Sequence, residues 1–136
     1  MFDPFQSPTN AYAAAIPLFC RAFLEERSPT IFGDGETSRD FTFIDNAVYA
    51  NELALFNDNP AAINQVYNVA CGDRISLNQV IHHLQEISGK NISPNYGPER
   101  KGDVKHSLAD ISKVKSLLEY SPKVNFSDGL KIVYDW

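Results

Sequence analysis

The sequence predicts a small α/β domain in which a small mixed sheet is flanked by helices. Short apolar runs with the character of strands alternate with longer runs whose apolar residues recur at helical spacing. The chain has 136 residues, which is enough for one hydrophobic core, so we expect one domain over residues 1–136. The sequence contains no internal repeat, linker or low-complexity run.

The amino-terminal part is predicted to contain a helix followed by a strand. Apolar residues at helical spacing favour a helix from Tyr12 to Glu26. Pro17 falls in its early turns, where a missing N–H group is best tolerated. Thr30–Phe32 is predicted to be a short strand that ends in a tight turn over Gly33–Gly35.

The next segment is predicted to form a second strand, a helix and a third strand. Phe41–Ile44 and Val66–Val69 have the apolar character of strands. Between them, Asp45 is expected to be the N-cap of a helix over Asn46–Phe56, because its carboxylate can accept free N–H groups and favours the helix dipole.

The carboxyl-terminal half is predicted to contain three further helices. Ser76 and Gln79 have the spacing of a capping box, which predicts a helix through Ile87 that Gly89 ends. The remaining expected elements are a weakly extended run over Ile92–Tyr96, a polar loop over Gly97–Ser107, a helix capped by Asp110 and ending at Leu118, and an amphipathic helix over Ser127–Trp136.

Composition excludes several classes of partner. The net charge is −5 and the positive residues form no stripe, so we expect no nucleic-acid partner. No run approaches the roughly 20 apolar residues that cross a bilayer, so we expect no membrane span. The amino terminus lacks the features of a signal peptide, and Cys20 and Cys71 fit a reducing cytoplasm better than a disulfide framework. Cys20 is expected to be a small core residue.

The sequence points to no metal site and no nucleophile. His82, His83 and His106 have no Cys, Asp or Glu at ligand spacing, so we expect no bound metal. No serine stands in a Gly-x-Ser-x-Gly elbow. Gly33-Asp34-Gly35 lacks the third glycine and the following helix of a dinucleotide-binding loop, and we interpret it as a turn.

Two arginines on loops are the residues that can grip a phosphate. Arg39 follows a turn and precedes an apolar run, so its planar fork of donors could reach phosphate oxygens. Spacing alone favours a pairing on the surface with Asp40 or Glu36 instead. Arg100 and Asp103 could hold a phosphate and a ribose diol around a flexible Gly102, or could belong to a solvated charged loop. Spacing alone favours neither arginine as a ligand.

Four motifs together resemble a known family. They are Ala11-Tyr12-Ala13-Ala14-Ala15-Ile16-Pro17, Gly33-Asp34-Gly35-Glu36-Thr37-Ser38-Arg39-Asp40-Phe41, Val66-Tyr67-Asn68-Val69-Ala70 and Glu99-Arg100-Lys101-Gly102-Asp103-Val104. In this order and spacing they resemble the C-terminal, substrate-binding part of extended short-chain dehydrogenases/reductases, the NAD-dependent epimerase/dehydratase family. The likeness is greatest to UDP-N-acetylglucosamine 4-epimerases and covers nearly the whole chain.

The resemblance implies a role for each of ten residues in binding a UDP-sugar. Arg39 and Arg100 match the arginines that hold the diphosphate, and Asp103 matches the residue that holds the ribose hydroxyls. The helix entry along the nucleotide is matched by Ala14, Ala15 and Ile16, the strand beside uracil by Thr30, Ile31 and Phe32, and a gate beside the sugar by Ser107. In this family a tyrosine at the gate excludes an N-acetyl group. The small Ser107 and Ala14 therefore imply UDP-GlcNAc or UDP-GalNAc rather than UDP-glucose.

The catalytic motifs of that family are missing from this chain. None of its seven glycines makes the Gly-x-x-Gly-x-x-Gly of the NAD-binding Rossmann domain, and none of its six tyrosines is followed four residues later by lysine. We therefore expect no catalytic and no cofactor-binding residue here, with NAD belonging to the full-length family. The simplest interpretation is a fragment that does not epimerise alone and binds a UDP-sugar weakly. Its exposed face would then self-associate or pair with a separate Rossmann domain.

Whether this chain is an enzyme is left open by the sequence. One alternative is a non-enzymatic module that binds a nucleotide or a protein. Another keeps the family but changes the reaction, to that of a related UDP-sugar epimerase or decarboxylase, or of a sugar-nucleotide 4,6-dehydratase.

Overall fold

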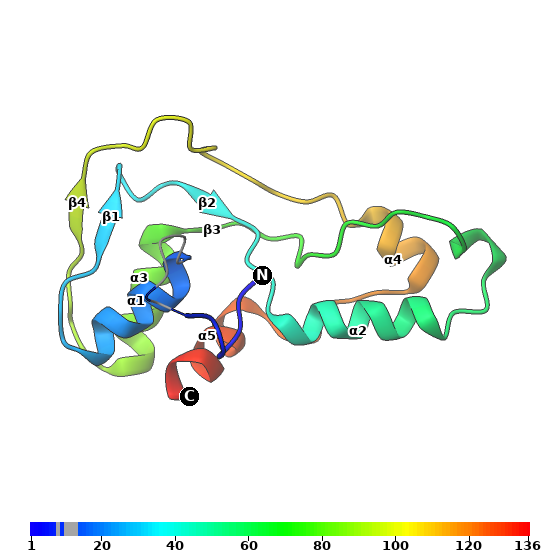
Figure 1. The fold of residues 1–136 in the computed structure, drawn as a ribbon, viewed down its shortest axis with the longest axis horizontal. Coiled ribbons are helices and arrows are strands. Elements are labelled where there is room, and N and C mark those ends of the chain that lie inside the picture. Colours follow the sequence, from blue (N-terminus) through cyan, green and yellow to red (C-terminus); the bar gives the residue numbers. More distant parts are fainter. Residues whose placement is uncertain (8, 10–13) are drawn as a thin grey trace.

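A computed structural model describes residues 1–7, 9 and 14–136. Figure 1 shows an elongated molecule with α1, α3 and α5 at one end and α2 and α4 at the other. The helices are α1 (Ala15–Leu24), α2 (Ile44–Leu55), α3 (Leu77–Ser88), α4 (Ser112–Leu118), α5 (Phe126–Asp135) and the 3-10 turn η1 (Pro60–Ala62). The strands are β1 (Thr30–Phe32), β2 (Ser38–Arg39), β3 (Ile75–Ser76) and β4 (Asn95–Gly97). Among the described residues, no helix is long and apolar enough to cross a membrane.

The strands form two short pairs. β1 and β4 are parallel, with Ile31 opposite Tyr96, and β2 and β3 are antiparallel, with Ser38 opposite Ser76. The small α/β class is therefore confirmed, and both strand orientations occur, but in two separate two-stranded sheets.

The larger core lies between the helices at one end of the molecule. α1 presents an apolar face that includes Phe19, Cys20 and Phe23, and this face packs with α3 and α5. Phe2 is 1% exposed and brings the amino terminus into the same core, where its ring contacts those of Phe43 and Phe126. Burial raises the pKa of the Cys20 thiol to about 12, so Cys20 is a small core residue as predicted.

A smaller core joins α2 to α4. It is built from Ala50, Ala70, Val114, Leu118 and Tyr120, together with Ile111. The Tyr120 hydroxyl donates to the carbonyl of Ala70 at 3.0 Å, and burial raises the pKa of this phenol to about 12.

Asn46 ties the two ends of the molecule together. Its side chain is fully buried at the start of α2. Its Nδ2 donates to the carbonyl of Val124 at 2.7 Å, and its Oδ1 accepts from the N–H groups of Lys123 and Val124 at 2.8 and 3.0 Å. One buried amide therefore satisfies three backbone groups of the segment that leads into α5.

Local chemistry explains the helix ends that were predicted correctly. The Ser76 hydroxyl accepts from the N–H of Gln79, and the Gln79 side chain accepts from the N–H of Ser76, so the capping box at α3 is confirmed. Gly89 ends α3 in the left-handed conformation, as expected. The helices ending at Leu118 and near the carboxyl terminus are also confirmed.

Two predicted strands are wrong. Over Phe41–Ile44 only Phe43 makes a bridge, and it pairs with the single residue Phe2; the strand of this region is β2, just before it. Residues 66–69 form no strand, because their backbone has no neighbouring strand among the described residues with which to pair. Apolar character favours a strand, but a strand also needs a neighbouring strand to pair with.

Two predicted caps are displaced by one or two residues. α2 begins at Ile44, with Phe43 as its N-cap, so Asp45 lies in the first turn and its charge still favours the helix dipole. α4 begins at Ser112, and the Asp110 carboxylate accepts from the Ser112 N–H at 2.9 Å. The predicted helix start at Tyr12 lies outside the described residues.

We predict that Asn46→Ala destabilises the fold by about 3 kcal/mol, because it leaves three backbone groups without their partner. Asn51→Ala on the same helix is the control, since its exposed Nδ2 bonds only the carbonyl of Ala47, and we expect a change below about 0.5 kcal/mol. Urea unfolding followed by circular dichroism measures both. Equal effects of the two substitutions would contradict the tie through Asn46.

Candidate functional site

Eight of the ten residues predicted to bind substrate line one cavity of about 300 Å³, which we name the arginine cavity. Its walls come from the start of α1, from β1, from β2 and from the loop after β4. The eight residues are Ala14, Ala15, Thr30, Ile31, Phe32, Arg39, Arg100 and Asp103. Side chains that are up to 89 positions apart in the sequence therefore meet at one place.

The amino end of α1 contributes electrostatics as well as space. Ala14 and Ala15 begin the helix and line the cavity with small side chains. The first N–H groups of a helix have no intrahelical acceptor and carry the positive end of its dipole. An anionic group bound beside Ala15 would therefore be favoured.

Arg39 is not paired with either neighbouring acid. Its Nη1 donates to the carbonyl of Ser38 at 2.8 Å and to that of Lys105 at 3.5 Å. The Asp40 carboxylate instead accepts from the N–H groups of Cys71 and Gly72, at 2.9 Å each. The Glu36 carboxylate accepts from Asn78 at 2.6 Å. Two backbone carbonyls thus orient the guanidinium, and its other donors remain for a ligand.

Arg100 and Asp103 stand at the two ends of a tight turn. The N–H of Asp103 donates to the carbonyl of Arg100 at 3.4 Å, and Gly102 has a φ of 88°, which a side chain would disfavour. The Arg100 guanidinium lies 4.0 Å from the centre of the Phe32 ring. This cation–π contact turns the arginine toward the cavity. The loop is exposed, as the charged-loop alternative expected, yet it brings both charges to the site.

The other two predicted residues do not line the arginine cavity. Ile16 is 1% exposed and belongs to the larger core, so its side chain packs in the core and helps to hold α1 in place. Ser107 is exposed and its N–H donates to the carbonyl of Ser38 at 3.1 Å, which places it beside β2.

Five lining residues were not predicted: Leu18, Phe19, Thr37, Phe41 and Leu77. Helical spacing could have found Leu18 and Phe19, which stand four positions after Ala14 and Ala15. Phe41 stands two positions after Arg39, the spacing of one strand face. Thr37 and Leu77 are joined by a hydrogen bond from the Leu77 N–H to the Thr37 carbonyl, and no local pattern indicates it.

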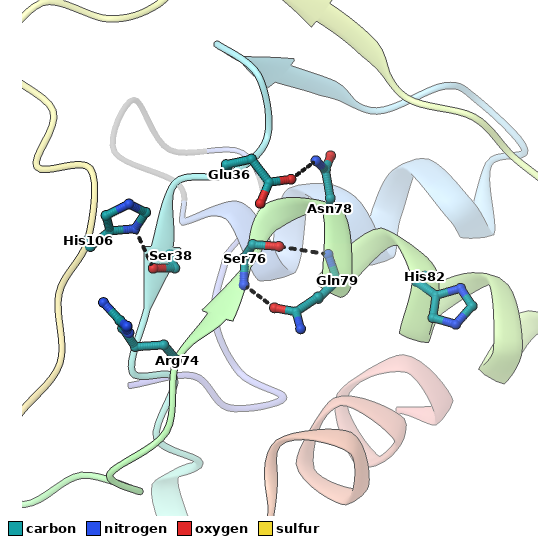
Figure 2. Close-up of a pocket in the computed structure, with 8 residues that line it drawn as sticks. All are labelled: Glu36, Ser38, Arg74, Ser76, Asn78, Gln79, His82 and His106. Carbon is teal, nitrogen blue, oxygen red and sulfur yellow. Dashed lines mark hydrogen bonds between the residues drawn. The ribbon is translucent and has the colours of Figure 1, made fainter.

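A second, polar cavity of about 570 Å³ is lined by Ser38 rather than Arg39. Successive side chains of a strand point to opposite faces, which explains why these neighbours serve different cavities. Figure 2 shows the side chains that line it, including the hydrogen bond between His106 and Ser38. Arg74 directly precedes β3, and His82 lies on α3. We name this the polar cavity; its residues are Glu36, Ser38, Arg74, Ser76, Asn78, Gln79, His82 and His106.

Neither cysteine has the environment of a nucleophile. Burial raises the pKa of the Cys71 thiol, and the nearby Asp40 carboxylate raises it further. Within the described part of the chain, no group of three or more His, Cys, Asp or Glu side chains could hold a metal ion.

We predict that Arg39 and Asp40 act independently on stability. Asp40→Ala leaves two backbone N–H groups without their acceptor and should cost about 2 kcal/mol, whereas Arg39→Ala should cost less than about 1 kcal/mol. The double variant, measured by urea unfolding, should equal the sum of the two to within about 0.5 kcal/mol. A larger coupling would show that the two side chains are paired after all.

Comparisons with known proteins agree with the resemblance seen in the motifs. Residues 3–133 match the protein family described as GDP-mannose 4,6 dehydratase. The UDP-glucuronate 4-epimerase of Thermodesulfobacterium geofontis is 37% identical over 87% of this chain and 36% of its own length.

Two solved structures have the same fold over almost the whole chain. One is the UDP-N-acetylglucosamine 4-epimerase of Methanobrevibacter ruminantium M1 in complex with UDP-N-acetylmuramic acid, with a TM-score of 0.89 and 38% identity over 99% of this chain and 42% of that one. The other is the UDP-glucuronic acid 4-epimerase of Bacillus cereus in complex with UDP-glucuronic acid and NAD, with a TM-score of 0.87 and 37% identity over 98% of this chain and 41% of that one. The chain thus spans about 40% of the length of these relatives.

Proposed function

The chain belongs to the GDP-mannose 4,6-dehydratase family of extended short-chain dehydrogenases/reductases, and from that premise we propose that it is the UDP-sugar-binding part of a nucleotide-sugar 4-epimerase. The observation that supports this most is the meeting of Arg39, Arg100 and Asp103 in one cavity. A volume of about 300 Å³ is at the lower end of the range for small-molecule sites.

Each part of a nucleoside diphosphate has a chemical match in the arginine cavity. Arg39 and Arg100 can donate charge-assisted hydrogen bonds to the two phosphates, to which the amino end of α1 adds its dipole. The Asp103 carboxylate can accept from the ribose hydroxyls. Ile31 and Phe32 offer an apolar wall to the flat uracil ring.

The sugar itself is proposed to be an N-acetylhexosamine. Ala14 lines the cavity and is small, which leaves room for an N-acetyl group. Ser107, the other small residue expected beside the sugar, lies on the loop that carries Arg100 and Asp103. We therefore propose UDP-GlcNAc or UDP-GalNAc as the ligand in preference to UDP-glucose.

This chain's residues bind and orient the nucleotide sugar; they do not carry the proton or hydride steps. The family chemistry uses NAD, and the Bacillus cereus relative is complexed with it. The glycines of this chain do not form a dinucleotide-binding loop and no tyrosine has its partner lysine, so the residues present do not fit NAD. The free thiols of Cys20 and Cys71 are consistent with the cytoplasm as the proposed compartment.

We predict that UDP binds through the two arginines. Isothermal titration with UDP should detect weak binding that falls by roughly threefold or more in Arg39→Ala and in Arg100→Ala. Each substitution removes a charge-assisted contact of roughly 1.5–3 kcal/mol, less the part lost to solvent. Lys101→Ala is the matched control, because Lys101 adjoins Arg100 but does not line the cavity.

The same titration decides the ligand class. UDP-GlcNAc should bind at least as tightly as UDP, and UDP-glucose no more tightly. Binding of UDP that is unchanged in both arginine variants would refute the proposed site, and tight binding of NAD would refute the domain assignment.

An exposed apolar face supports a role in association as well. Leu55, Phe56, Ile63 and Val66 are 60–87% exposed near the end of α2 and in the segment after it. Backbone groups of residues 64–69 form no backbone hydrogen bond with the described residues. Apolar groups and unpaired extended backbone tend to mark interaction surfaces. We propose that this face self-associates or pairs with a separate Rossmann domain, which is also the observation that favours an interaction module as the second candidate function.

We predict that light scattering detects concentration-dependent self-association, and that the double variant Leu55→Asp with Val66→Asp shifts the molecule toward the monomer. The control is Leu24→Asp, which adds one such charge to an exposed apolar residue at the end of α1. Helix α1 lies at the opposite end of the molecule from α2 (Figure 1). A strict monomer at high protein concentration would count against self-association, and would leave the pairing with a Rossmann domain to be tested by mixing the two.

A further inference from the structure

The loop that carries Arg100 and Asp103 has few buried side chains to hold it. Residues 98–108 are all exposed. Backbone hydrogen bonds fasten its far end to β2, from the N–H of Ser38 to the carbonyl of Lys105 at 2.9 Å and from the N–H of Ser107 to the carbonyl of Ser38 at 3.1 Å. Exposed hydrogen bonds with little apolar burial around them open readily. The contacts around Ser38 therefore help to place the loop, together with the exposed ion pair between Lys105 and Asp34 at 3.4 Å and the contact of Arg100 with Phe32.

One side-chain contact reinforces this junction. The Ser38 hydroxyl and His106 Nδ1 are 2.8 Å apart (Figure 2). Ser38 is 6% exposed with His106 in place, and loss of the imidazole would remove the side-chain partner of its hydroxyl. Either neutral tautomer of His106 can complete the bond, because a hydroxyl can both donate and accept.

This contact joins the two halves of the arginine cavity. Ser38 directly precedes Arg39, and His106 follows Asp103 by three positions. The Arg39 guanidinium also donates to the carbonyl of Lys105, the neighbour of His106. The contact of His106 with Ser38 therefore lies where the segment that carries Arg39 meets the segment that carries the Arg100–Asp103 turn.

We infer that His106 is a positioning residue, whose hydrogen bond to Ser38 holds the Arg100–Asp103 loop against β2 so that the two arginines can act on one diphosphate. The inference rests on the proposed function. His106 acts from the polar cavity, on the opposite face of β2, and need not touch the nucleotide. The inferred role of His106 is therefore structural, to position the loop, rather than to bind a metal or to catalyse.

The test compares three substitutions at position 106. His106→Ala removes the bond. His106→Asn restores a hydrogen-bonding group near the position of Nδ1, whereas His106→Gln places its amide near that of Nε2. His82→Ala is the matched control, because His82 also lines the polar cavity but lies on α3 and forms no bond to Ser38. Circular dichroism confirms that each variant is folded.

Two measurements are made on every variant. Amide hydrogen exchange, without ligand, reports the protection of the Ser38 and Ser107 N–H groups. Titration with UDP reports binding. In His106→Ala and His106→Gln we expect exchange at both amides to quicken by roughly fivefold or more and UDP to bind roughly fivefold more weakly, the effect of about one hydrogen bond. His106→Asn should return both values to within about twofold, and His82→Ala should change neither.

The outcomes separate the two proposals. Unchanged exchange and UDP binding in His106→Ala overturn the inference, and so does weaker binding that His106→Asn fails to restore. If the unsubstituted chain does not bind UDP at all, the proposed function fails; the exchange data then still decide whether His106 holds the loop, because they need no nucleotide.

Discussion

The pairing of β2 on both of its edges is the constraint on which the site depends. Ser38 pairs with Ser76 of β3 on one side and bridges to His106 on the other. The residues just before it accept from the first N–H groups of α3, at the carbonyls of Gly35 and Thr37. A strand of two residues thus fixes a helix, a loop and an arginine relative to one another. Because its two side chains point to opposite faces, Arg39 lines the arginine cavity and Ser38 forms a hydrogen bond with His106 of the loop.

The parts of this structure that could be predicted from the sequence are those with a local cause. The start of α3 is set by two side chains three positions apart and its end by one glycine, and β1 was predicted from Thr30 and two apolar residues before a turn. The site residues were predicted differently. Spacing alone favoured neither Arg39 nor Arg100 as a ligand, and the likeness of four ordered motifs to a known family identified them. Eight of the ten line one cavity in the structure, and their role in binding a nucleotide sugar stays a prediction.

What could not be predicted depends on contacts between distant segments. Residues 66–69 have the character of a strand, but a strand also needs a neighbour, and no described segment lies beside them in register. Asn46 and Val124 are 78 positions apart, and Ser38 and His106 are 68 apart, so no periodic pattern could reveal either contact. The same reasoning explains Arg39: its acidic neighbours were plausible partners until the fold gave Asp40 two backbone N–H groups to bind.

Solvent access weakens the contacts that the arginine cavity can offer to a phosphate. Arg39 is only partly buried and Arg100 is exposed, so water competes with a bound phosphate for their donors. Charge–charge attraction strengthens as the effective dielectric constant falls. Any partner that covered the cavity would therefore strengthen both arginine contacts without touching the nucleotide. The isolated chain, whose cavity is open to solvent, should therefore hold a diphosphate with preformed but hydrated contacts.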